Sequence, residues 1–270
     1  MTRMSIVIVN YRSGRELASC LRSVVRNAGE LDYEIFIINN DRPEDLSPVA
    51  DPTSARIRVI QNRSNRGFAA AANQGYRQAR GPLLLLLNPD VRVEAGALQI
   101  LADTLEQHPD AGMVLPRLNS PDGGLQYSCR RFYTLPTLLL RRAPLLRLWR
   151  NHPSLRRHLM ADWDHLSLSE VDWGLGAAML VRRAATESNA HLMDERFFLY
   201  FEDVDLCKSM WDRGWKVLYN PAARMVHSHR RDSARGWRLG AKRHHLFSLF
   251  KFLWKHRLRL GRCPETGGNA

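Results

Sequence analysis

A run of acids in this 270-residue chain has the composition and position expected of a general base. Glu202-Asp203-Val204-Asp205 follows an aromatic segment and opens a predicted helix. Acids at a helix start complement the helix dipole, but three acids within four residues exceed what that role needs. A carboxylate in partly apolar surroundings has a raised pKa and can accept a proton during catalysis. We predict a general base here, with helix capping as the alternative.

A second acid and two histidines have the types that bind metal ions. Asn88-Pro89-Asp90 directly follows the most hydrophobic run of the chain, and a carboxylate there can hold a hard divalent cation that neutralises a diphosphate. The alternative is an ordinary turn. His227 and His229 end a short predicted strand and point to one face, where they could coordinate a metal. The alternative is a solvated, basic strand end.

Two further segments suit a sugar phosphate. Trp173 and Gly176 lie in the segment VDWGLGAA, where the indole could stack on a sugar and glycine lets the backbone approach a ligand. Arg66 precedes an Ala-rich helix, and the start of a helix favours an anionic group. The alternatives are a packed strand with a tight bend and an ordinary surface arginine.

Alternating apolar runs predict the elements that position these residues. Strands are expected at 5–10, 33–39, 57–61, 82–87, 112–116, 171–182, 216–219 and 225–227, and helices at 13–25, 67–78, 96–107, 202–213 and 239–256, with a helical or loop insertion at 120–169. The first helix opens with a capping-box pattern at 13–16, and Gly214 ends the fourth. The alternation predicts an α/β protein with a mostly parallel sheet flanked by helices. Ligands bind beyond the carboxyl ends of such strands, which points to Asn10-Tyr11, Asn39-Asn40 and 88–90.

The charge balance favours a polyanionic partner. Forty Lys and Arg oppose 27 Asp and Glu, giving a net charge of +13, with basic regions at 141–157 and 230–262. Helix 239–256 mixes basic and aromatic residues, so it could lie on an anionic membrane or pack on the core; both remain open. The chain has no RNA-binding aromatic motif and no zinc-finger spacing, which argues against a nucleic-acid partner. The first strand is not followed by GxGxxG, which argues against an NAD-dependent enzyme.

The location expected from the sequence is the cytoplasm. None of the four cysteines has CxxC spacing, and reduced thiols are the simplest interpretation. The first ten residues enter a strand-like run rather than a basic leader. No apolar run approaches the roughly 20 residues that span a bilayer, so any contact with the inner face of the cell membrane would be peripheral.

Taken in order, these segments resemble the inverting glycosyltransferases of family 2 with the GT-A fold, and among them the bacterial rhamnosyltransferase-like branch. The resemblance extends from Ser5 to His229 and is carried by SIVIVNY, NRGFAAAANQG, LLLLNPDV, VDWGLGAAMLVRR, DERFFLYFEDVDLCKSMWDRGWKV and VH. It implies a Rossmann-like nucleotide-binding half at about 1–118, an acceptor half at about 119–235, and a basic C-terminal helix and tail at 236–270.

The resemblance also implies roles for individual residues. Asp203 is the expected catalytic base, with Glu202 contacting substrate, and Asp90 and His227 are expected to hold Mg²⁺ or Mn²⁺. The expected contacts of the donor are Val9, Asn10, Tyr11, Asn39, Asn40, Arg66, Asn88 and Asp90 for the nucleotide diphosphate, with Trp173 and Gly176 facing the sugar and acceptor. One departure stands out: relatives usually carry Asp-Asn where this chain has Asn39-Asn40, so base selection is expected to be weaker or altered, unless Asp41 takes that role.

The implied reaction moves a sugar from a dTDP- or UDP-sugar to a hydroxyl of a glycan or lipid-linked acceptor, in cell-surface polysaccharide or glycolipid synthesis. The resemblance favours dTDP-rhamnose as donor, with UDP- and GDP-sugars as open alternatives. An inactive relative that only binds sugar nucleotides is the alternative, because Asn39 and Asn88 replace acids that many relatives carry.

Overall fold

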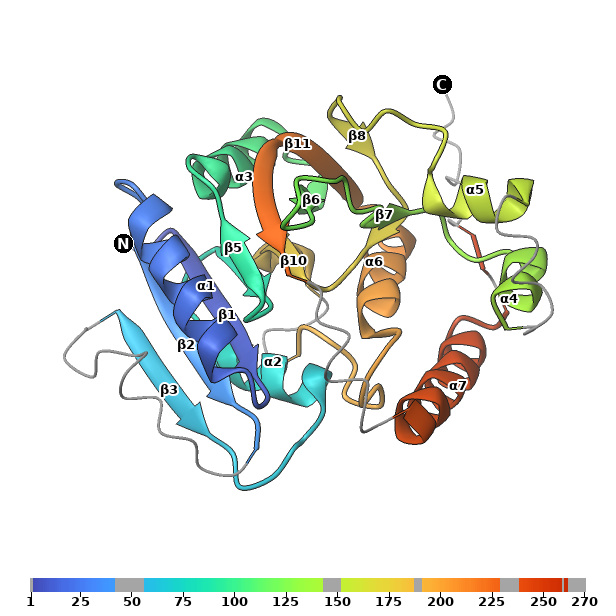
Figure 1. Cartoon of the computed structure of the whole chain (residues 1–270), viewed down its shortest axis with the longest axis horizontal. Helices are drawn as coiled ribbons and strands as arrows, with labels where there is room; N and C mark the ends of the chain where they lie inside the picture. The colour runs from blue at the N-terminus through green and yellow to red at the C-terminus, as the bar shows by residue number, and fades with distance from the viewer. Residues whose placement is uncertain are drawn as a thin grey trace.

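The computed structural model describes residues 2–41, 56–142, 152–186, 191–228, 238–258 and 260–261. A nine-stranded sheet with the order β3-β2-β1-β4-β10-β6-β11-β5 forms its centre, and β8 pairs with β11 (Figure 1). Its strands are β1 Met4–Asn10, β2 Tyr33–Asn39, β3 Ile57–Gln61, β4 Leu83–Leu87, β5 Val91–Val93, β6 Ala111–Asn119, β8 Ser169–Glu170, β10 Ala178–Arg182 and β11 Lys216–His227. A second, two-stranded sheet pairs β7 (Cys129–Arg130) with β9 (Trp173–Gly174).

Helices cover both faces of the large sheet. They are α1 Gly14–Asn27, α2 Phe68–Gln78, α3 Ala97–Gln107, α4 Leu135–Arg142, α5 Pro153–Leu159, α6 Glu202–Asp212 and α7 Arg238–Lys255. Alternate residues of β1 enter different cores: Ile6 and Ile8 pack with residues of α1 and α3, whereas Val7 and Val9 pack with residues of α2 and α6. This double burial explains why the central strands are apolar without interruption.

The predicted mostly parallel α/β sheet is confirmed, with antiparallel pairings that the sequence did not predict: β5 and β8 each run antiparallel to β11, and β10 is reversed within the sheet. Strand β1 pairs in parallel with β2 and β4, and β6 pairs in parallel with β11. Strand β10 lies between β4 and β6 and is antiparallel to both. An apolar run fixes that a strand is buried but not its direction, because direction depends on how the chain returns to the sheet.

Three local predictions need correction. The expected strand at 171–182 is two short strands separated by a turn, so Gly176 lies in a loop. The segments 216–219 and 225–227 belong to one strand, β11, whose pairing with β6 shifts register between Asn220 and Arg224. Ser13 forms no capping box: its hydroxyl donates to the Tyr11 carbonyl at 3.0 Å. Gly214, with φ of 79°, ends α6 as predicted.

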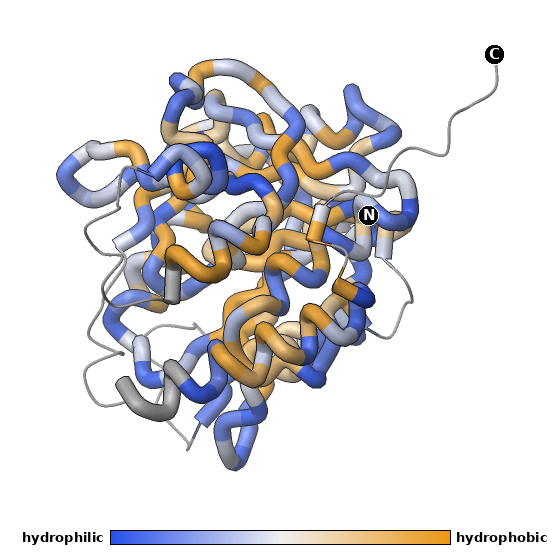
Figure 2. Tube along the Cα trace, turned by 90° about the vertical axis from the view of Figure 1, so that its right-hand side faces the viewer, coloured by the Kyte–Doolittle hydropathy of each residue, from blue (hydrophilic) through white to orange (hydrophobic). Residues whose placement is uncertain are grey.

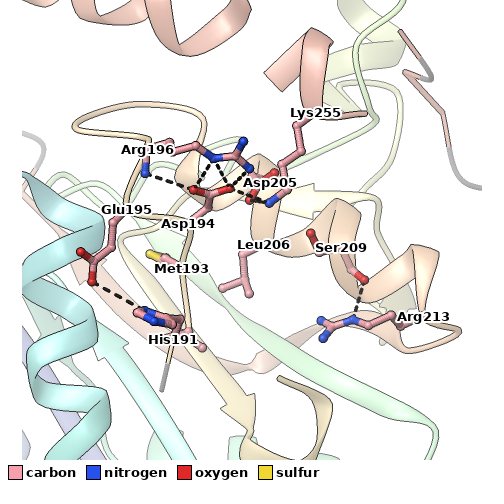
Figure 3. A pocket seen from close by; sticks show the side chains of 11 residues that line it. His191, Met193, Asp194, Glu195, Arg196, Asp205, Leu206, Ser209, Arg213 and Lys255 are labelled. Carbon is pink, nitrogen blue, oxygen red and sulfur yellow. Dashed lines mark hydrogen bonds and ion pairs between the residues drawn. The ribbon is translucent and has the colours of Figure 1, made fainter. Parts of the chain in front are cut away.

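The C-terminal helix α7 is attached to α6 through an ion-pair network. Nζ of Lys255 lies 2.7 Å from Oδ2 of Asp205 and 3.0 Å from Oδ2 of Asp194. Nε2 of His256 lies 2.8 Å from the other oxygen of Asp205. Figure 3 shows Asp194, Asp205 and Lys255 of this network beside a cavity of about 340 Å³ between the 191–196 segment, α6 and Lys255. The charged groups around that cavity therefore pair with one another and fix the helix.

None of the described helices is both long and apolar enough to cross a membrane. Cys20, Cys129 and Cys207 are buried free thiols, as the sequence predicted, and Cys263 lies outside the described residues.

Candidate active site

A turn after β4 places an acid beside a histidine from β11. Segment 88–90 connects β4 to β5, and β5 pairs antiparallel with the end of β11, so that Val91 lies opposite His227. As a result, Nε2 of His227 lies 3.4 Å from Oδ2 of Asp90. The sheet thus brings together the two residues predicted as metal ligands. His229, the other histidine of that prediction, lies outside the described residues.

Gln126 orients the histidine, and sequence reasoning missed it. Its amide nitrogen donates to the carbonyl of His227 at 2.8 Å and to Oγ of Ser120 at 3.1 Å, while its Oε1 lies 2.9 Å from Nδ1 of His227. Because the amide nitrogen is the donor in both other bonds, the amide oxygen is the atom available to accept from Nδ1, and this contact directs Nε2 of His227 toward Asp90. No motif marks Gln126, which lies in the insertion predicted only as helix or loop.

The pair fits a divalent cation. A carboxylate oxygen and an imidazole nitrogen are both ligand types for divalent cations, and here they lie 3.4 Å apart. Fixing the imidazole through its other nitrogen is typical of metal-bound histidines. Across the described ranges no group of three or more His, Cys, Asp and Glu is arranged to hold a metal ion. Mg²⁺ usually takes only one or two protein carboxylates and completes its shell with water and substrate phosphates, so a two-residue site is sufficient.

The predicted base lies in the first turn of α6. Oδ2 of Asp203 accepts a hydrogen bond from the Gly176 N–H at 3.1 Å, and Oδ1 accepts one from the Val204 N–H at 2.8 Å. Burial raises the pKa of Asp203, while these two backbone bonds and the charge of Arg130 lower it; the net direction is upward. A carboxylate with a raised pKa is a stronger base, as the predicted role requires.

The three acids at the start of α6 have three different environments. Asp205 pairs with α7 through Lys255 and His256. Glu202 is buried, and its Oε2 accepts no hydrogen bond from the part of the chain that the structure describes. Burial, and then the charge of Asp203, raises the pKa of Glu202 to about 8. The neutral form of Glu202 is therefore favoured at neutral pH.

We expect Glu202→Gln to stabilise the protein at alkaline pH. The folded pKa of Glu202, about 8, lies above its ordinary value of 4.5, so the stability that the neutral acid provides is complete below 4.5 and is lost as pH rises through 8. Glutamine cannot ionise and avoids that loss. Thermal melts of both proteins between pH 5 and 9 check this. As pH rises, the Tm of the variant should increase by several degrees relative to the Tm of the wild type. If the difference in Tm between the two proteins stays constant from pH 5 to 9, the buried, neutral Glu202 is contradicted.

One turn links the predicted base to the segment predicted to bind a metal ion. Gly176 donates its N–H to Asp203, and the next residue, Ala177, accepts a hydrogen bond from the N–H of Asn88 at 2.8 Å. Asp203 and Asn88 are thus bonded to adjacent residues of a single loop, and Asp90 follows two residues later. Asp90 and His227 lie together, and Asp203 is bonded to the loop that also binds Asn88; convergence of all three on one site stays a prediction.

An amide network closes the ends of β1 and β2. The side chain of Asn10 donates to Oδ1 of Asn39 at 2.9 Å, and Asn39 donates to Gln61 at 2.8 Å. Oδ1 of Asn40 accepts from Asn62 and from the N–H of Arg66, both at 3.0 Å. All three predicted asparagines are buried.

This burial corrects part of the predicted nucleotide site. The side chains of Asn10, Asn39 and Asn40 bond to one another or to their neighbours, and Val9 lies in the core, so the structure does not support direct donor contacts from these four side chains. They fix the floor of the site. Tyr11, half-buried, and Arg66, exposed, lie at the same edge, and their donor contacts stay predictions. Asp41 pairs with Arg12.

Gly67 holds the segment of Arg66 against the segment that leads to the base. Its φ is +84°, and an added Cβ would lie 2.7 Å from the carbonyl oxygen of Phe198. The N–H of Phe68 donates to that same oxygen at 2.9 Å. Glycine is required here because any side chain would separate α2 from the segment before α6.

The sugar-stacking role predicted for Trp173 is not supported. Its side chain is only 3% exposed, and its indole N–H donates to the Arg131 carbonyl at 3.0 Å. Trp173 instead supports Arg130, whose guanidinium lies 5.7 Å from the centre of the indole ring and lowers the pKa of Asp203. Sequence reasoning missed Arg130 because it lies in an arginine-rich stretch with no distinguishing motif.

Comparison with solved structures identifies the architecture. The mannosyltransferase PcManGT from Pyrobaculum calidifontis, solved with GDP-Man and Mn²⁺, superposes with a TM-score of 0.62 at 15% identity, covering 93% of this chain and 64% of that one. The chain therefore spans less than two thirds of that protein. The likeness shows that the predicted GT-A fold is correct.

Comparison with curated sequences gives the family. Over 260 residues the chain is 28% identical to rhamnosyltransferase WbbL of Escherichia coli K12, covering 94% of this chain and 93% of the relative. It is also 28% identical over 239 residues to the N-acetylglucosaminyl-diphospho-decaprenol L-rhamnosyltransferase of Mycobacterium tuberculosis, covering 83% and 75%. The model of "Glycosyl transferase family 2" matches residues 5–161, more than half of the chain. The protein is thus a glycosyltransferase that belongs to glycosyl transferase family 2 and is of the rhamnosyltransferase-like type.

Proposed function

We propose that this glycosyltransferase transfers a sugar, with inversion and with the aid of a divalent cation, from a nucleotide diphosphate donor to an acceptor hydroxyl. The observation that carries the proposal is the loop at 176–177, which is hydrogen-bonded to Asp203 on one side and to Asn88 on the other. The proposed proton acceptor and the segment proposed to bind the diphosphate are thereby bonded to the same loop. A single displacement needs these two groups close together because proton removal and departure of the diphosphate occur in one step.

Asp90 and His227 would hold the cation. Bound there, Mg²⁺ or Mn²⁺ would neutralise the charge of the diphosphate leaving group. The comparison structure was solved with Mn²⁺, which supports a divalent ion of this class. Gln126 contributes by keeping Nε2 of His227 directed at Asp90.

In the proposed reaction, Asp203 accepts the proton of the acceptor hydroxyl. As that oxygen forms a bond to the anomeric carbon, the bond between this carbon and the diphosphate oxygen breaks, and a nucleoside diphosphate departs. The N–H groups of Gly176 and Val204 hold both oxygens of the carboxylate in place. Because Glu202 is neutral, it adds no competing negative charge beside the base. Attack from the face opposite the leaving group inverts the anomeric centre.

The relatives support the choice of substrates. Both curated relatives named above are rhamnosyltransferases, so we propose L-rhamnose as the transferred sugar, with dTDP-rhamnose as the donor and UDP-sugars as alternatives. One of them is named for a diphospho-decaprenol acceptor, which supports a lipid-linked acceptor in cell-surface polysaccharide or glycolipid synthesis. A cytoplasmic location, at the inner face of the cell membrane, fits these substrates.

A thermal-shift series with nucleotide diphosphates and nucleotide sugars, with and without Mn²⁺, tests the donor site. A donor at about 100 times its Kd should stabilise the protein by about 2.7 kcal/mol. We expect dTDP compounds to raise Tm only when Mn²⁺ is present. An equal rise without the ion would contradict metal-dependent binding, and no rise with any nucleotide would contradict the donor site. NMR of the anomeric proton in a transfer product then distinguishes inversion from retention.

A further inference from the structure

Helix α7 presents two chemically different faces. Leu249 and Phe252 are buried against the rest of the molecule. On the other side, Phe250 is 60% exposed and Trp254 85% exposed. The further exposed apolar residues of this helix and its C-terminal turn are Leu246, Phe247 and Leu258. At 100° per residue the four that lie in the helix, Leu246, Phe247, Phe250 and Trp254, fall within one sector, so they form a continuous apolar stripe that no described part of the chain covers.

Helix α4 adds to this exposed surface. Leu135 and Leu139 lie one helical turn apart and are both exposed. In Figure 1 α4, α5 and α7 lie on the same side of the molecule, and Figure 2 views that side, with hydrophobic segments running along the helices that face the viewer. Residues 260–261, just after α7, line a cavity together with Thr137 of α4 and His158 of α5.

The chain segments that form this surface carry charge of one sign. The sequence has no Asp or Glu from 123 to 161, which includes α4 and α5, and none from 233 to 264, which includes α7. Arg243 and Lys251 are exposed within or beside the apolar stripe. Exposed aromatic residues framed only by cations are typical of a helix that lies in the headgroup region of an anionic bilayer. A protein partner would have to supply a complementary acidic groove, whereas an anionic lipid surface matches both features.

The buried face of α7 contacts the segment that leads into the catalytic helix. Oγ of Ser248 donates to the Leu199 carbonyl at 2.9 Å, and Nζ of Lys251 donates to the Arg196 carbonyl at 2.6 Å. The ring of Phe201, which directly precedes Glu202 and Asp203, lies 5.5 Å from the ring of Phe252. A surface bound by α7 therefore lies close to the start of α6.

We propose that the exposed faces of α4 and α7 form a docking surface for an anionic lipid bilayer, with the side chains of Phe250 and Trp254 entering the headgroup region. The surface holds the start of α6 near the membrane, where a lipid-linked acceptor would present its hydroxyl; this second statement rests on the proposed function. The occupant of the stripe is lipid, not a second copy of the chain.

Vesicle co-sedimentation of the full chain tests the proposal. The protein should bind phosphatidylcholine vesicles that contain phosphatidylglycerol, and should bind pure phosphatidylcholine vesicles or the mixed vesicles in high salt much less, because the attraction to anionic lipid is screened. The double variant Phe250→Ser/Trp254→Ser should lose at least about tenfold in partitioning, since two large apolar side chains no longer enter the bilayer. Arg243→Glu should also weaken binding to the anionic vesicles, because it replaces a positive charge of the surface by a negative one.

Leu166→Ser is the matched control, because Leu166 is 68% exposed but lies outside both helices; it should bind as the wild type does. Thermal melts of all variants should agree, since every changed side chain is exposed. Absence of wild-type binding to anionic vesicles, or unchanged binding by the double variant, overturns the proposal. The proposal is also overturned if light scattering shows that the wild type is a dimer and the double variant a monomer, since the stripe would then be a dimer interface. Metal-dependent nucleotide binding, measured separately by thermal shift, reports on the proposed function whatever the vesicles show.

Discussion

Asp203→Asn is expected to lower kcat for sugar transfer by about 10²–10⁴-fold, the range typical for loss of a general base. The amide cannot take the proton of the acceptor hydroxyl, while its shape matches that of the carboxylate. Its oxygen can still accept one of the two backbone hydrogen bonds now made by the side chain, from Gly176 or Val204. Transfer should be measured by release of nucleoside diphosphate at saturating donor and acceptor.

The control for this variant is Asp164→Asn. Asp164 is exposed and its carboxylate also accepts a backbone hydrogen bond, from Leu166 at 3.0 Å, so it reports the effect of the same substitution away from the site. We expect normal activity for Asp164→Asn, and normal metal-dependent nucleotide binding for both variants. Full transfer by Asp203→Asn would remove this residue from the mechanism, and Glu202 would become the candidate base.

Asp90→Asn should remove most of the metal-dependent activity. The change keeps the size of the side chain but replaces a charged ligand by a neutral amide, which is a poor ligand for a hard divalent cation. We expect weaker Mn²⁺ binding in the presence of nucleoside diphosphate, measured by electron paramagnetic resonance of free Mn²⁺, and a loss of kcat/KM of about 10² or more, because transition-state charge on the diphosphate is no longer neutralised. Treatment of the wild type with EDTA should reproduce the loss, and added Mn²⁺ should reverse it.

A graded series around Asp90 separates a metal role from a structural one. Gln126→Leu leaves both predicted ligands in place but removes the bond that orients His227, so Mn²⁺ affinity should fall by about 10–100-fold, as for other residues that position a metal ligand. Asp103→Asn, on the outer face of α3, should behave as the wild type. If Asp90→Asn binds Mn²⁺ as the wild type does, the Asp90–His227 pair is an ordinary polar contact and the cation binds elsewhere.

Strands buried on both faces are uniformly apolar, so a polar residue at the end of such a strand stands out in the sequence. Candidate site residues at the strand ends could therefore be identified from the sequence. Asp90, which follows 83–87, and Asn10, the last residue of 4–10, were found in this way. The acids of α6 were found because three carboxylates at a helix start exceed what the helix dipole explains. Gln126 and Arg130 could not be found, since a single amide or arginine in an irregular segment has no periodicity or neighbour that sets it apart.

By itself the sequence determined the α/β class, the order of the elements and the set of titratable residues from which a site could be built, because these follow from local periodicity and residue chemistry. Only the tertiary structure decided which of those residues meet. Asp90 faces His227 because β5 pairs with β11, and Asp203 is held by a loop that also binds Asn88. It also decided against Trp173 as a sugar platform by burying the ring. Pairing and burial join segments far apart along the chain, and local patterns carry no information about which distant partner a side chain acquires.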